Sequence, residues 1–186
     1  MIATAGASVT YDTTHTRGIG LSAKHVVSPR QDAYYEWDRS FGTQTAWNGR
    51  VYVWFDNLPS GDLRLVRARG NNALRFAIDI MKNGQLRVKD SSNFTIATLR
   101  TPIVTGSWVR IEWGVNHASG QVEVRLFNSP NLTSATDTIA SATGRSIGSA
   151  TDTVQIGRSG SQTFSATFWT DDPAIGTKGF IGPVMT

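Results

Sequence analysis

The sequence predicts an all-β fold, a sandwich or barrel of antiparallel strands, and three observations support this prediction. First, short stretches of alternating apolar and polar residues recur at spacings of about 8 to 12 residues, with turn residues between them. Second, no stretch carries the 3.6-residue periodicity of a long helix. Third, charged residues make up 17% of the chain, against about 25% on average. Strands and turns are therefore favoured over solvent-exposed helices.

The 186 residues are expected to form a single domain over 1–186, with an N-terminal arm at 1–7 and a C-terminal tail at 176–186. The chain has no cysteine, so packing must hold the fold without disulfides. The first residues lack the basic and apolar segments of a signal peptide, and no run approaches the roughly 18 apolar residues of a membrane span. We therefore expect neither signal-dependent secretion nor a membrane partner.

In the N-terminal half, alternation of apolar and polar residues marks several strands. They are expected at 8–12, 21–27, 33–38, 49–55, 63–69 and 73–80. In the fourth of these, Val51, Val53 and Phe55 fall on one face and Tyr52 and Trp54 on the other. The first face is assigned to the core, so the two aromatic residues opposite it are expected to face outward.

A hairpin is predicted after residue 73. Pairing Ile80 with Leu86 leaves Lys82-Asn83-Gly84 as the loop, with Gly84 in a left-handed conformation. The same register sets Asp79 opposite Arg87, so charge pairing on the polar face agrees with apolar pairing on the other.

The longest pattern is a second hairpin at 107–127, with alternation on both sides of a glycine-containing turn. Pairing Trp113 with Val124 keeps the apolar faces together and sets Glu112 across from Arg125. A slip of two residues would oppose Glu112 and Glu123 instead. Trp113 is therefore expected in the core and the charged face in contact with solvent.

The remaining segments are shorter or less regular. A strand is expected at 94–99 and a turn at 101–106, whereas 128–150 is polar and receives no strand. Strands at 152–156 and 165–171 are expected to close the fold, followed by a Gly-rich tail at 176–183.

Four stretches carry a family resemblance: WVRIEW at 108–113, QVEVRLF at 121–127, TVQIGRS at 153–159 and FWTDDPAIGTKGFIGP at 168–183. Over about residues 8–183, the chain resembles the concanavalin A-like jelly roll. It is most similar to the lectin-like or laminin-G-like modules of actinobacterial surface proteins and of structural proteins of actinobacterial tailed phages. The resemblance implies a two-sheet antiparallel jelly-roll sandwich. It does not fix the activity, because this fold hosts lectins, glycanases, lyases and scaffolds.

Catalysis is not expected. Some glycanases of this fold carry a strand with three spaced carboxylates, but Glu36-Trp37-Asp38 matches only half of that pattern, and Ser40 and Phe41 follow. Glu112 and Glu123 have a diagonal spacing that would suit an inverting pair. Arginines flank both, which lowers a carboxyl pKa, so an ion-pair ladder is the preferred interpretation.

Metal sites and cofactors are not expected either. His15, His25 and His117 lie on separate elements without ligand spacing and are interpreted as surface histidines. Asp171 and Asp172 leave one alternative open, a calcium site completed by Asp152 or a backbone carbonyl.

The chain carries a net charge of +4, mostly through arginine. Arg64, Arg67, Arg69 and Arg75 cluster in sequence and would suit a phosphate or an acidic polysaccharide, since a guanidinium matches planar anions. The alternative is a set of solvated strand faces. A nucleic-acid partner is not expected, because the dense basic stripe with stacking aromatics is missing.

Carbohydrate is the partner that the aromatic residues suggest, because an exposed flat ring stacks on a sugar. The candidate binding residues are Tyr52, Trp54, Trp47 and Tyr34. The alternative for each is burial in the sandwich or under a covering loop.

Together these observations predict a non-catalytic virion surface protein with a lectin-like jelly roll that binds host or environmental glycans. It would be assembled in the cytoplasm and released in the particle. The alternative is a purely structural decoration or minor tail protein that contacts other virion proteins or further copies of itself. A glycan-cleaving enzyme is the least favoured alternative.

Overall fold

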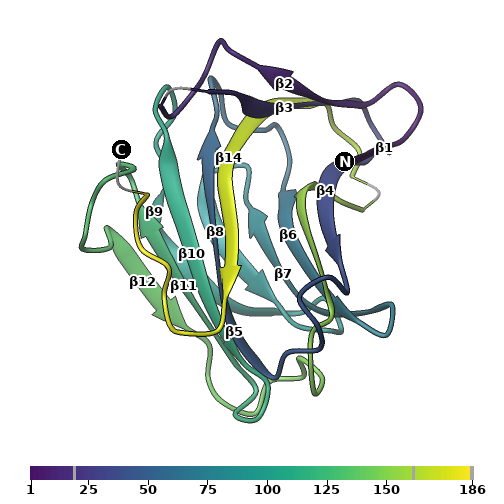
Figure 1. Ribbon diagram of the computed structural model, residues 1–186, viewed down its shortest axis with the longest axis vertical. Coiled ribbons are helices and arrows are strands. Elements are labelled where there is room, and N and C mark those ends of the chain that lie inside the picture. The colour runs from purple at the N-terminus through teal and green to yellow at the C-terminus, as the bar shows by residue number, and fades with distance from the viewer. Residues whose placement is uncertain (19, 161, 185–186) are drawn as a thin grey trace.

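Two antiparallel sheets face each other in the computed structural model, which describes residues 1–18, 20–160 and 162–184 (Figure 1). Sheet A contains, in spatial order, β1 (Ile2–Ala3), β4 (Ala33–Asp38), β13 (Thr153–Arg158), β6 (Leu63–Gly70), β7 (Ala73–Ile80), β8 (Gln85–Lys89) and β9 (Thr95–Pro102). Sheet B contains β12 (Asp137–Ala140), β11 (Gln121–Phe127), β10 (Val109–Asn116), β5 (Ala46–Trp54), β14 (Ala166–Gly176), β3 (Ser22–Val27) and β2 (Ser8–Asp12). The all-β sandwich expected from the sequence is confirmed.

Most predicted strands are present, and the differences lie at their ends. β14 continues past the expected end at 171 to Gly176, through a bulge between Asp171 and Ala174. Two strands were missed, β1 in the N-terminal arm and β12 inside 128–150. They have two and four residues, too few for an alternation to stand out. No helix of the described chain is long and apolar enough to cross a membrane.

The hairpin of β10 and β11 has the predicted register. Trp113 pairs with Val124, and Glu112 pairs with Arg125. Trp113 is fully buried, and a Cβ on Gly49 would lie 2.1 Å from its ring, so the indole needs a glycine on the neighbouring strand. The ion pairs, however, run along each strand, from Arg110 to Glu112 and from Arg125 to Glu123, rather than across the hairpin.

The β7–β8 hairpin also has the predicted register. Ile80 pairs with Leu86 and Asp79 with Arg87, and Gly84 has a φ of 84°. A nitrogen of Arg87 lies 3.0 Å from the Asp79 carboxylate. The agreement of charge and apolar patterns therefore identified the register correctly.

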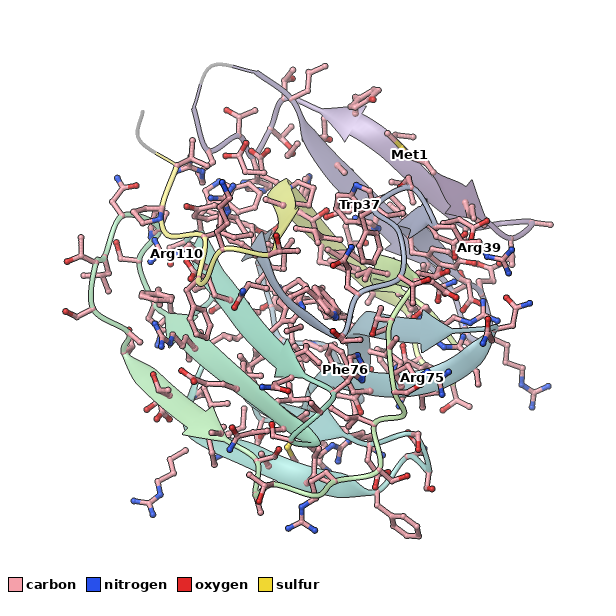
Figure 2. All side chains as sticks on the ribbon, turned by 60° about the horizontal axis from the view of Figure 1, so that its bottom comes forward. Met1, Trp37, Arg39, Arg75, Phe76 and Arg110 are labelled. Carbon is pink, nitrogen blue, oxygen red and sulfur yellow. The ribbon has the colours of Figure 1, made fainter. Side chains whose placement is uncertain are left out.

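The core fills the space between the two inward faces. Figure 2 shows Phe76 among the side chains of this interior. The largest fully buried apolar side chains are Trp47, Trp113, Phe55, Phe76, Phe168, Leu63, Leu65, Ile78 and Ile80. Such burial is worth about 25 cal/mol per Å² of apolar area, so this layer is the main source of stability.

The charged face of β10 is not in contact with solvent, and that prediction is wrong. Arg110 and Glu112 are each 1% exposed. Arg110 donates hydrogen bonds to the carbonyls of Pro130 and Leu132, so the loop after β11 covers it. The alternation identified this face correctly as the outer one, but a strand pattern carries no information about a distant loop that covers it.

The C-terminal tail, residues 177–184, follows β14 and lies over the outer face of sheet B (Figure 1, yellow). Arg125 stacks on the Phe180 ring at 3.5 Å, and Arg50 donates a 2.8 Å hydrogen bond to the carbonyl of Gly182. The Val184 N–H donates to the Tyr52 hydroxyl at 3.0 Å. The tail therefore closes much of the face on which a ligand had been expected.

Candidate functional site

The four predicted carbohydrate-binding aromatics do not form one site. Trp47 is 1% exposed and lies in the core, with its ring edge-on to Trp113 at 6.2 Å. The expectation that it is exposed is wrong, because β5 begins at Ala46 and Trp47 shares the inward phase of Val51.

Tyr52 does lie on the outer face of sheet B, as its alternation predicts, but it is 0% exposed. The guanidinium of Arg17 sits 4.2 Å from the centre of its ring, and its hydroxyl accepts the hydrogen bond from Val184. A sugar therefore has no access to this ring, and the predicted exposure of Tyr52 is wrong.

Trp54 is half-buried beside Tyr52. One face of its indole stacks on His15 at 4.5 Å, and its Nε1 donates a 2.8 Å hydrogen bond to Asp56. The edge of the Trp108 ring contacts it as well, at 5.9 Å. Because its N–H and one face of its ring already have partners, Trp54 has less free ring surface for stacking on a sugar than the sequence predicted.

Tyr34 lies on the outer face of the other sheet, in β4. It is half-buried and pairs with Gly157 of β13 in register. Burial raises the pKa of its hydroxyl, with Glu36 and Asp32 adding to the effect. Tyr34 is thus the one predicted aromatic that lies apart from sheet B.

Next to Tyr34 begins a row of residues that crosses the outer face of sheet A, and we call it the polar row because all but one of its members are polar. In register order it consists of Glu36, Gln155, Arg67, Ala77, Lys89 and Thr95, one residue from each of six strands. Neighbouring strands lie about 4.8 Å apart, so successive members are lateral neighbours on this face. The inward neighbours on these strands, such as Val154 and Phe76, belong to the core.

The polar row is tightly organised at one end. The Gln155 amide is 2% exposed and donates a 2.6 Å hydrogen bond to the Glu36 carboxylate. The Oε1 atom of Gln155 is buried without a partner in the described residues, and so is the Nε atom of Arg67 next to it. Both residues therefore hold unused hydrogen-bonding capacity that lies buried on the outer side of sheet A.

Further arginines surround Arg67. Burial lowers the pKa of Arg67, and the nearby charges of Arg69 and Arg64 lower it further. Arg64 donates to Asp79 at 3.1 Å, and Arg69 donates to the carbonyl of Asn72 at 2.8 Å. Their guanidinium groups are engaged, but their charge makes this part of the face electropositive.

The carboxylates considered for catalysis are held by cations or amides. Glu112 is buried, and its Oε1 lies 2.8 Å from the Nε of Arg110. The two atoms form an ion pair, but their geometry does not meet that of a hydrogen bond. Glu123 accepts a hydrogen bond from Arg125, and Glu36 from Gln155. The ion-pair interpretation of the central hairpin is confirmed for each arm.

The residues considered for metal binding have other roles. Arg17 donates to Asp171 and Asp172, whereas Asp152 accepts from Asn71 at the far end of sheet A. Among the described residues no group of three His, Cys, Asp or Glu side chains is placed to hold a metal ion.

Two of the three histidines are buried, and the surface interpretation is wrong for them. His25 contacts the carbonyl of Ala33 at 3.0 Å and the hydroxyl of Thr170 at 2.8 Å. His117 contacts the carbonyl of Gly148 and the hydroxyl of Thr151 in the same way. Both act as polar links inside the fold.

Sequence reasoning noted Arg67 as one of four clustered arginines but missed Gln155. The signal was present, because Thr153 and Gln155 alternate with Val154 and Ile156 and so occupy the outer phase of β13. What the sequence did not indicate is that β13 lies between β4 and β6, which brings Gln155 between Glu36 and Arg67.

No protein-family model matches the chain, and no curated protein matches it.

Solved structures do match it. A sialidase aligns with 86% of the chain at 10% identity and a TM-score of 0.60. A SAP-like pentraxin from Limulus polyphemus aligns with 91% at 14% identity, and an alginate lyase of polysaccharide lyase family 7 with 91% at 10% identity, each with a TM-score of 0.50. The chain spans 16% of the length of the sialidase, 75% of the pentraxin and 76% of the lyase.

These likenesses establish the fold. The chain is a concanavalin A-like sandwich of two antiparallel seven-stranded sheets, an architecture shared by lectins, pentraxins and glycan-degrading enzymes.

Proposed function

We propose that the chain is a non-catalytic glycan-binding jelly roll carried on the surface of a virion, as in the modules of tailed phages that its sequence resembles. The observation that carries the glycan-binding part is the outer face of sheet A. There Tyr34 and the polar row combine an aromatic ring with amide, carboxylate and guanidinium groups, the mixture that recognises sugar rings and their hydroxyls.

The similar solved structures support this choice of ligand. Their names describe a sialidase and an alginate lyase, enzymes named for glycan substrates. They are only distantly similar in sequence, so the support concerns the class of ligand and not the sugar.

We propose a non-catalytic function because each candidate carboxylate is already engaged by a neighbouring side chain. Glycoside hydrolysis needs one carboxyl group that can donate a proton and a second placed across the substrate. Glu36 is hydrogen-bonded by Gln155, and Glu112 and Glu123 are each paired with an arginine of their own strand. A carboxylate that is already engaged by a neighbouring side chain is poorly placed to transfer a proton to a leaving group.

Display in many copies would make weak binding useful. Contacts to one or two sugar rings give affinities of about millimolar to micromolar, and linked copies raise the overall avidity by about 10²- to 10⁴-fold. A virion is an array of this kind. Mass spectrometry of purified particles from the source organism tests this part, and particles that lack the chain would contradict it.

A glycan array with three proteins tests the binding function. We expect wild type to bind a defined set of glycans, Tyr34→Ala to lose most of the signal and Trp54→Ala to keep it. The two variants remove one half-buried aromatic each, from sheet A and sheet B respectively. Binding that is lost in Trp54→Ala but kept in Tyr34→Ala would return the site to sheet B, and no binding by wild type would refute the function.

A structural role is the second candidate, and one surface favours it. β2 is an edge strand of sheet B, and Tyr11 on it is 69% exposed. Met1, Ile2 and Leu21 add further exposed apolar side chains from the N-terminal region. Unpaired edges with exposed apolar residues are sites of strand addition between chains. Sedimentation of wild type and Tyr11→Lys distinguishes a self-associating protein from a monomer.

A further inference from the structure

We infer that Arg67 is the recognition residue of a site for carboxylate-bearing glycans, formed on the outer face of sheet A by Arg67, Gln155 and Tyr34. This inference rests on the proposed glycan-binding function and names the class of sugar. The first observation behind it is that the Nε of the Arg67 guanidinium is buried and has no partner among the described residues.

Leaving a charged donor buried without a partner costs more than leaving a neutral one. Arg67 differs in this from the arginines beside it. Arg64 donates to Asp79 and Asn93, and Arg69 donates twice to the carbonyl of Asn72. The Nε of Arg87 on this face is also unpaired, but Arg87 donates to Asp62 and Asp79. Among the described residues, Arg67 is therefore the arginine of this face that an anion would complete.

Gln155 is placed to position this guanidinium. It pairs in register with Arg67, and its Oε1 is an acceptor without a partner in the described structure. In the inferred site, the Nε of Arg67 donates to that oxygen. The two terminal nitrogens would then face outward as a fork, the geometry that binds a planar carboxylate through two parallel hydrogen bonds. Gln155 is held in turn by its 2.6 Å hydrogen bond to Glu36.

The surrounding charge favours an anion. Arg64 and Arg69 lie close enough to lower the pKa of Arg67, so they add positive potential at the site. Glu36 is separated from Arg67 by Gln155, which occupies the intervening strand. The charge of Asp32 acts on the pKa of Arg67 in the opposite sense, but more weakly than the charges of Arg69 and Arg64, so the cations outweigh it at the site.

The spacing of the cations on this face suits a chain of sugars. Ala77 follows Arg67 in the polar row, and Lys89 follows Ala77, so a small side chain separates two cations that lie two strands, about 10 Å, apart. On the other side of Arg67, Tyr34 lies between Gly157 of β13 and Ile2 of β1. A polymer with regularly spaced carboxylates would contact both cations, with a sugar ring against Tyr34.

The test uses calorimetric titration of the full chain with matched ligands. Oligogalacturonate and sialyllactose carry carboxylates, methyl-esterified oligogalacturonate and lactose are their neutral counterparts, and poly(glycerol phosphate) carries phosphate instead. We expect a carboxylate-bearing ligand to bind and its neutral counterpart to bind at least tenfold more weakly. Arg67→Gln should weaken the carboxylate ligand about 10- to 100-fold, and Arg67→Lys, which keeps the charge but not the fork, should fall between.

The matched control is Arg145→Gln, which removes the same charge from an exposed position in the loop after β12 and should leave affinity unchanged. Equal losses in both variants would show attraction by net charge alone and overturn the assignment. Binding of neutral glycans with no effect of Arg67→Gln would overturn the assignment while leaving the proposed function intact. Arg67-dependent binding of the phosphate polymer alone would overturn both. If no glycan binds, the proposed function fails together with it. Melting temperatures of the variants confirm that each is folded.

Discussion

Replacing Trp113 with alanine should remove one of the main supports of the sandwich. The side chain is 0% exposed, meets Trp47 edge-on at 6.2 Å, and occupies the space left by Gly49. Truncating a buried tryptophan costs about 3–5 kcal/mol, a large part of a total stability of about 5–15 kcal/mol. With a urea slope of about 2–3 kcal/mol/M, the midpoint should fall by about 1–2.5 M.

Far-UV circular dichroism is the suitable probe, because it does not depend on the fluorescence of the deleted indole. The control is Phe94→Ala, which removes an aromatic that is 71% exposed and should change stability by no more than about 0.5 kcal/mol. A Trp113→Ala midpoint as close to wild type as that of Phe94→Ala would refute the assignment of Trp113 to the centre of the core.

Three further predictions concern groups that hold the fold. Burial lowers the pKa of His25 to about 4, below its unfolded value of 6.5, so the unfolded state binds the proton first. The free energy of unfolding should therefore fall by about 2 kcal/mol between pH 7.5 and pH 5. Urea titrations at these two pH values measure the loss, and equal midpoints would contradict it. Asp79→Asn should lower the free energy of unfolding by about 2–3 kcal/mol, because Arg64 and Arg87 lose the charge of a buried partner. The control Asp62→Asn removes a more exposed carboxylate and should cost less than about 1 kcal/mol. Similar losses in urea denaturation of both variants would rule out a special role for Asp79. Phe180→Ala removes the ring on which Arg125 stacks and should loosen the C-terminal tail. Hydrogen exchange of the Val184 amide, which donates to the Tyr52 hydroxyl, should then become faster. An unchanged exchange rate would show that Phe180 does not anchor the tail.

Strand phase could be predicted from the sequence, but exposure could not. The alternation placed Tyr52 and Glu112 on the outer face of sheet B, and both are there. Whether an outer residue meets water depends on what lies over it, and here that is the tail and the loop after β11. These segments carry no periodicity, so nothing in a strand pattern reports that they fold back over the sheet.

The candidate site was only partly predictable for a related reason. Tyr34 and Arg67 were each identified from sequence, for different ligands and on separate strands. What joins them is β13, which lies between β4 and β6 although it follows them by about a hundred residues. Pairing of strands so distant in the chain is set by the global topology, and no local pattern encodes it. Trp47 was misassigned for a simpler reason, since its strand begins three residues earlier than expected.

The central claim is that glycans bind on the outer face of sheet A, and chemical-shift mapping of the ¹⁵N-labelled chain tests it most directly. The ligand is the oligosaccharide with the strongest signal on the array, titrated to saturation. We expect the largest shifts on β4, β13 and β6, at Tyr34, Gln155 and Arg67, with little change on β5 and β14. Shifts centred on Trp54 and its neighbours in sheet B would contradict it.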